Sequence, residues 1–127
     1  MPLRYDIELE PSLVKVTVHG KLDYMSLDQL WSTIVTACRK HNCRNILGIA
    51  YIENPTAGDA YDHAEIFDVA GLTTNIRIAW VEQNPEAQDL ASFTEAVIRN
   101  RGLATGRVFS SEKKARRWLA ESAIDAA

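Results

Sequence analysis

The sequence has few cysteines, no long apolar run and no excess of basic residues. Only two of its 127 residues are cysteines, Cys38 and Cys43, and they are not spaced as Cys-x-x-Cys, so neither a disulfide framework nor a zinc or redox site is indicated. The longest apolar run, residues 46–52, is far shorter than the ~20 residues that cross a bilayer. The formal net charge of -3 argues against broad nucleic-acid binding, which needs a concentrated basic surface.

The first ten residues, MPLRYDIELE, have no apolar segment of the kind found in secretory signals. Together with two cysteines that fit reduced thiols, this predicts a cytoplasmic protein. The chain is 46% apolar and 24% charged, which is ordinary for a globular protein. Its length predicts one domain over residues 1–127, large enough to bury a core without disulfides or metal.

Two segments near the start alternate apolar and polar residues. They cover residues 5–9 and 14–18, with Pro11 and Ser12 between them. Period-two alternation with one polar face is typical of half-buried strands, and the proline and serine favour a turn. The pair is therefore predicted to form an antiparallel hairpin.

After the hairpin, helical and strand patterns alternate. Helices are predicted over about 27–38 and 58–70, from Pro85 to about residue 98, and after a cap at Ser110. Buried strands are predicted at 46–52 and 76–81, and a short strand at 107–109. The order β-β-α-β-α-β-α-β-α predicts a mixed, mostly parallel sheet of four or five strands with about four helices. The strand at 46–52 is apolar on both faces and is expected inside the sheet.

Two stretches resemble a known family. VTVHGKLDYMSLDQL resembles the STAS pattern of a strand, Gly-x-Leu-Asp (here Gly20, Leu22 and Asp23) and a first helix. VFSSEKKARRWLAE resembles the closing strand, cap and helix of the same family, especially of the anti-sigma-factor-antagonist-like branch that is grouped with lipid-transfer CRAL-TRIO proteins. The resemblance in element order covers nearly the whole chain. It implies a STAS-like fold and a non-enzymatic regulatory or protein-interaction module.

The chain departs from that family after the strand that ends at Ile52. There the antagonists carry Asp-Ser-Ser-Gly or a close variant, in which a partner kinase phosphorylates one serine, whereas this chain carries ENPTAG at 53–58. Thr56 is the nearest hydroxyl to the family's acceptor. Because Thr-Ala-Gly-Asp also has the form of a capping box, Thr56 is predicted to be either a helix cap or a phospho-acceptor.

Four titratable residues follow on the second predicted helix: Asp59, Asp62, His63 and Glu65. Asp59 and His63 are four apart and should share a helix face, but no second histidine or cysteine lies at a spacing useful for a metal. No nucleophile motif accompanies them either. We expect a solvated acidic face, with no metal, no cofactor and no catalytic residue; a small enzyme would have to rest on Asp59, Asp62 and His63 alone.

Aromatic residues suggest one possible ligand site. Open α/β sheets bind ligands at the carboxyl ends of their strands, and a small apolar pocket there is predicted to be lined by Tyr51, Tyr61, Phe67 and Trp80. Core packing is the alternative explanation. If the pocket exists, the chain would be a carrier or sensor of a small apolar or lipid-like ligand.

The leading prediction is a cytosolic, non-enzymatic STAS-like module that binds a partner protein, and a homodimer is one state that the sequence allows. The C-terminal third is biased toward basic residues, with Arg99 and Arg101 followed by four more between 113 and 117. These form a solvated surface or contact an acidic partner or anionic headgroups. The sequence identifies neither the partner nor the ligand.

Overall fold

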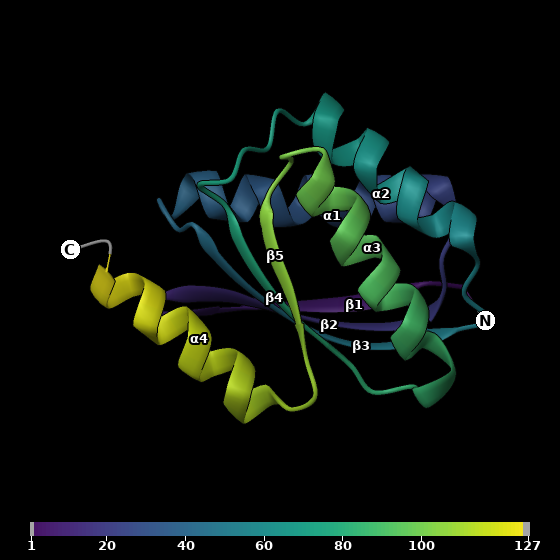
Figure 1. Cartoon of the computed structure of the whole chain (residues 1–127). Helices are drawn as coiled ribbons and strands as arrows, with labels where there is room; N and C mark the ends of the chain where they lie inside the picture. The colour runs from purple at the N-terminus through teal and green to yellow at the C-terminus, as the bar shows by residue number, and fades with distance from the viewer. Residues whose placement is uncertain (1, 126–127) are drawn as a thin grey trace.

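The structure, a computed structural model, describes residues 2–125, with the backbone alone for 122–125 (Figure 1). Its elements are β1 (Arg4–Glu10), β2 (Leu13–Lys21), α1 (Tyr24–Lys40), β3 (Asn45–Glu53), α2 (Ala57–Val69), β4 (Arg77–Glu82), a 3-10 turn η1 (Pro85–Ala87), α3 (Gln88–Asn100), β5 (Thr105–Phe109) and α4 (Glu112–Asp125). The predicted order of strands and helices is confirmed.

The five strands form one sheet in the order β1-β2-β3-β4-β5. β1 runs antiparallel to β2, with Tyr5 opposite Val18, and the remaining pairs are parallel. The hairpin therefore supplies the antiparallel edge, as predicted. β3 lies between β2 and β4, so the expectation that residues 46–52 are interior is also confirmed.

Helices cover the two faces of the sheet unequally. α1, α2 and α3 lie on one face, and α4 lies on the other (Figure 1). The larger apolar core packs between the sheet and the three helices, and includes Val16, Trp31 and Phe67. A smaller core under α4 includes Leu47 and Leu119. Both faces of β3 are buried in this way, which explains its continuous apolar run.

Local side-chain chemistry sets most helix boundaries. Asp23 caps α1, because its carboxylate accepts the backbone N–H of Ser26 at 2.9 Å. Two boundaries differ from the prediction. Residues 85–87 form a 3-10 turn and the α-helix begins only at Gln88. The last helix is capped by Ser111 and not by Ser110, since Ser111 Oγ accepts the backbone N–H of Lys114 at 3.2 Å.

Arg116 ties α4 to the hairpin. Its two terminal nitrogens donate to the Glu10 carboxylate at 2.8 and 2.9 Å, and its Nε donates to Glu112 at 2.8 Å. The hydrogen bonds from Arg116 are the main reason that the pKa values of Glu10 and Glu112 lie below their usual range. The pair with Glu10 is bidentate, the strongest geometry for such a contact.

Replacing Arg116 with methionine is expected to cost about 1 kcal/mol of unfolding free energy at neutral pH, because the group is partly exposed and screened by solvent. The folded-state pKa values of both glutamates are lowered, so their stabilising effect is present above the ordinary pKa of 4.5 and is lost as pH falls below it. Urea denaturation from neutral pH to about pH 3 should therefore show the two proteins converging. Exposed Arg117, changed to methionine, serves as control. A difference that persists in acid would mean that Arg116 acts through packing.

Candidate functional site

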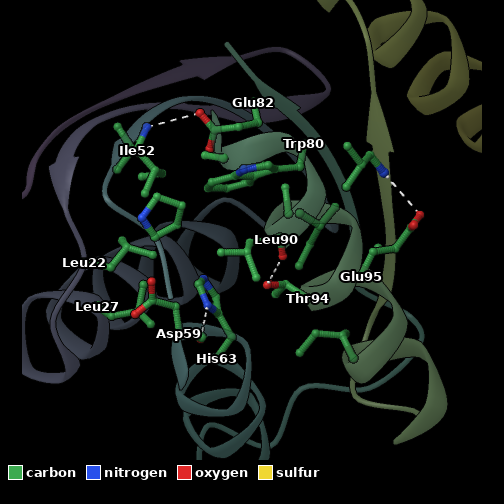
Figure 2. A pocket seen from close by; sticks show the side chains of 18 of the residues that line it. Leu22, Leu27, Ile52, Asp59, His63, Trp80, Glu82, Leu90, Thr94 and Glu95 are labelled. Carbon is green, nitrogen blue, oxygen red and sulfur yellow. Dashed lines mark hydrogen bonds between the residues drawn. The ribbon is translucent and has the colours of Figure 1, made fainter. Parts of the chain in front are cut away.

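A half-open apolar pocket lies toward the carboxyl ends of β2, β3 and β4, between the sheet and helices α1, α2 and α3 (Figure 2). Its volume is about 90 Å³. The wall is mostly apolar and includes Leu22, Leu27, Trp31, Ile52, Phe67 and Leu90. This is the place at which parallel sheets commonly bind ligands, and the pocket is much smaller than a typical ligand site.

A glycine and three aromatic rings build the floor of the pocket. Gly48 leaves space on β3 for the indole of Trp80, because a Cβ at Gly48 would overlap the six-membered ring of that indole. Trp31 from α1 lies against Trp80 with ring centroids 6.1 Å apart, and meets Phe67 edge-on at 4.5 Å. Edge-on and offset ring pairs of this kind stabilise a core beyond their buried area.

His63 on α2 places a ring nitrogen in the pocket. The side chain is only 9% exposed, and its Nδ1 lies 2.8 Å from the backbone oxygen of Asp59. A carbonyl oxygen can only accept, so Nδ1 carries the hydrogen. Burial lowers the pKa of His63 and outweighs the opposing hydrogen bond to Asp59, so the ring is neutral near pH 7 and Nε2 holds a lone pair. Figure 2 shows the ring directed into the pocket.

Glu82 closes one end of the pocket as a structural group. It is 4% exposed, and its Oε2 accepts the backbone N–H groups of Ile52 and Asn84 at 3.1 and 3.2 Å. Asn84 in turn donates its side-chain amide to the Ile52 carbonyl. Burial raises the pKa of Glu82 against these two hydrogen bonds. The carboxylate thus holds the ends of β3 and β4 together.

The four aromatic residues predicted to line a pocket do not come together. Phe67 and Trp80 do line it. Tyr51 lies on the opposite face of the sheet and stacks on His19 at 4.4 Å, because strand side chains alternate between faces and neighbouring Ile52 takes the pocket side. Tyr61 lies on the outer side of α2 against Phe93 at 5.8 Å and is 49% exposed.

The expected solvated acidic face of α2 needs one correction. Asp59 and His63 share a side of the helix as predicted, but His63 is buried. The sequence contains the signal for this: His63 lies three and four residues from Ala60 and Phe67, in the apolar stripe of α2. Trp31 and Glu82 were not among the predicted site residues, and Trp31 could be identified only as a residue on the inward stripe of α1.

Neither a metal site nor a membrane span appears within the described residues. No three histidine, cysteine or acidic side chains between residues 2 and 125 are grouped so that they could hold a metal ion. In the same part of the chain, no helix combines the length and the apolar character needed to span a membrane.

Thr56 occupies the N-cap of α2 and is exposed. Its backbone N–H donates to Oδ2 of Asp59 at 2.9 Å, and the two residues form a reciprocal capping box. This arrangement satisfies amides at the start of the helix that have no partner within it. It also places a carboxylate beside the only hydroxyl of the 53–58 segment.

Changing Thr56 to alanine is expected to lower the unfolding free energy by about 0.5 to 2 kcal/mol, because alanine cannot accept from the first turn of the helix. Serine or aspartate at the same position keeps a capping oxygen and should cost much less. Chemical denaturation of the three variants beside the unmodified chain measures this. Equal losses in all three would show that the side chain does not act as a cap.

Comparisons with known proteins were informative only at the level of structure. No family model matches the chain, and no curated protein matches it. Among solved structures, the chain is similar to one described as "Structure of the Anti-Sigma Factor Antagonist SpoIIAA in its Unphosphorylated Form", at 15% identity and a TM-score of 0.48, over 90% of this chain and 95% of that chain. At 15% identity and a TM-score of 0.48, this likeness carries no conclusion about the family, a partner or an activity of the present chain, and the STAS-like resemblance stays a prediction from the sequence.

Proposed function

We propose that the chain is a non-enzymatic, cytosolic binding module to which a partner protein docks by inserting one side chain into the pocket. The supporting observation is a half-open apolar pocket of about 90 Å³. A cavity of about 150 Å³ takes one benzene molecule, so in proportion this pocket holds roughly four non-hydrogen atoms. That suits a side chain, whereas small-molecule sites usually measure about 300 to 1,000 Å³. Side chains anchored in such pockets dominate many interfaces.

The charges around the pocket favour a basic partner segment. α2, which contributes Asp59, His63 and Phe67 to the pocket wall, has four acidic residues in all and no lysine or arginine. Asp59 and Glu95 also line the pocket, together with one exposed cation, Arg107. Carboxylates that surround an apolar anchor site steer partners of opposite charge and set their orientation.

The volume also bears on the alternative, a carrier or sensor of a small apolar or lipid-like ligand. A lipid-like molecule has many more atoms than a pocket of about 90 Å³ can enclose. The partner-binding function is therefore the one the geometry favours. Native mass spectrometry of the purified protein distinguishes a carrier with a bound small molecule from a module without one, and it also reports whether the chain forms a homodimer.

Panning a random peptide library on the purified chain tests the proposal. We expect enriched peptides to share one apolar residue flanked by lysine or arginine, and to bind more weakly as salt rises. Ala91→Phe places a ring at the pocket wall and should reduce binding at least tenfold. Val69→Phe is the matched control, because Val69 lies on α2 with 80% exposure and does not line the pocket.

Two results would contradict this function. One is a set of peptides that bind the Ala91→Phe and Val69→Phe variants equally well. The other is a co-purifying small molecule that native mass spectrometry finds in the unmodified chain and not in the Ala91→Phe variant. The second result would establish the carrier function instead.

Phosphorylation of Thr56 is not expected to control this docking. A phosphate would add about -1.5 to -2 charges next to the Asp59 carboxylate that already binds the Thr56 amide. Lys21 reaches this loop, but its Nζ is bound to the Asn54 carbonyl at 3.0 Å. We expect phosphopeptide mass spectrometry of the native protein to find Thr56 unmodified, and Thr56→Glu to leave peptide binding unchanged. Substantial phosphate on Thr56, with loss of binding in that variant, would identify a phosphoswitch.

A further inference from the structure

We propose that the group inserted into the pocket carries a hydroxyl that donates a hydrogen bond to Nε2 of His63. This inference deepens the proposed docking function and rests on it: the partner's anchor would be a short, mostly apolar side chain with a hydroxyl, and not a pure hydrocarbon. The specificity would come from one ring nitrogen that has no donor in the described part of the chain and lies in a mostly apolar wall.

The hydrogen-bonding state of His63 is fixed by its neighbour. Nδ1 donates to the Asp59 carbonyl at 2.8 Å, and Nε2 of the neutral ring is left as an acceptor. Among residues 2–125, no donor to Nε2 is present. Nε2 is also directed into the pocket, toward the space between Leu22 and Leu90 (Figure 2). Nε2 is not among the fully covered side-chain atoms that lack a partner, so it opens onto the pocket space. A hydrocarbon group that fills this space would leave the acceptor without a donor, which is costly, whereas a ligand that supplies a donor avoids that cost.

Two further polar side chains of the wall, Thr94 and Glu95, already have hydrogen-bond partners, and the indole N–H of Trp31, although it has none within residues 2–125, is fully covered. Thr94 donates its hydroxyl to the Leu90 carbonyl at 2.8 Å, and Glu95 accepts the backbone N–H of Val108 at 3.2 Å. A water in the pocket would meet a mostly apolar wall, whereas a buried water typically needs two to four polar partners. A group with one donor and a hydrocarbon body matches this wall better than water does.

Two small probes of the same size test the chemistry of the pocket directly. Isopropanol and acetone share a carbon skeleton and the same number of non-hydrogen atoms, but only isopropanol donates a hydrogen bond. Titration of each into the nitrogen-15-labelled chain, followed by NMR, should show shifts at residues that line the pocket. We expect isopropanol to bind about fivefold more tightly, the factor given by a hydrogen bond of average net strength.

Two variants test whether His63 causes the tighter binding of isopropanol than of acetone. His63→Phe keeps an aromatic ring and removes the acceptor, so isopropanol should lose its advantage over acetone. Thr94→Val is the matched control, because it alters the same wall at a hydroxyl that is already bound to Leu90, and it should keep the advantage. If His63→Phe does not fold, the nitrogen-15 resonances of His63 in the unmodified chain test the same point. The chemical shift of Nε2 should be that of an unprotonated nitrogen, and it should change on addition of isopropanol and not of acetone.

Several outcomes would overturn the inference: equal or tighter binding of acetone, no binding of either probe, or a proton on Nε2 of the neutral ring. The peptide library separates this inference from the docking function. Peptides that bind through the pocket with a hydrocarbon anchor would leave the docking function in place and refute the role of His63. Peptides that ignore the pocket, together with preferential isopropanol binding, would refute the docking function and leave the chemistry of the pocket established.

Discussion

Replacing Trp31 with alanine is expected to lower the unfolding free energy by about 3 to 5 kcal/mol, among the largest effects of any single substitution in the chain. Trp31 is 2% exposed and contacts three aromatic rings, those of His63, Phe67 and Trp80. Removing the indole loses its buried area and leaves a cavity that joins the pocket. The rings of α2 and β4 cannot close that space without moving the helix.

Trp31→Phe distinguishes packing from hydrogen bonding at this position. The indole nitrogen of Trp31 is buried and has no hydrogen-bond partner among the described residues. Phenylalanine removes that nitrogen and keeps a ring, so it should cost much less than alanine. Urea denaturation monitored by far-UV circular dichroism measures both variants. Equal losses would mean that the nitrogen has a partner, such as an ordered water.

The order of elements could be predicted because each strand and helix carries its own periodicity. Residues 14–18 alternate apolar and polar side chains because one face of β2 packs on helices and the other is only partly covered. Residues 46–52 do not alternate, since both faces of β3 are covered. The alternation of helices and strands then allowed only a few arrangements of the strands in the sheet, because crossover connections between parallel strands are almost always right-handed.

Boundaries and the pocket depend on geometry that a pattern does not contain. Ser110 and Ser111 are equally good caps by type, and which one faces the first turn is set by where β5 ends. Pro85 fits an α-helix or a 3-10 turn equally well at its first position. Tyr51 and Ile52 are both apolar enough for a pocket, and only the register of β3 against β2, in which Tyr51 is opposite His19 and Ile52 opposite Gly20, decides which one faces the helices.

Gly48→Ala is the other substitution with a large expected effect, about 3 kcal/mol, at the upper end of the range for overpacking. Gly48 lies opposite Trp80 in the parallel pairing of β3 and β4, and a new Cβ would occupy the space of the indole ring. Backbone conformation does not cause the cost, because Gly48 is not among the glycines with positive φ. The ring must leave its position, and the pocket is the adjoining free space. The substitution should therefore also abolish isopropanol binding, which NMR titration measures.

A double-mutant cycle with Trp80→Leu separates this overlap from any other role of the glycine. In the Trp80→Leu background, alanine at position 48 no longer meets a ring, and it should be neutral or slightly stabilising, because glycine in a strand is entropically costly by about 0.5 to 1 kcal/mol. The coupling energy from the cycle should then approach the full cost of Gly48→Ala. Alanine at position 106, a glycine on β5 with open space around its Cβ position, controls for the general effect of the change. If Gly48→Ala costs as much in the Trp80→Leu background as in the unmodified chain, the floor of the pocket does not depend on the fit between Gly48 and Trp80.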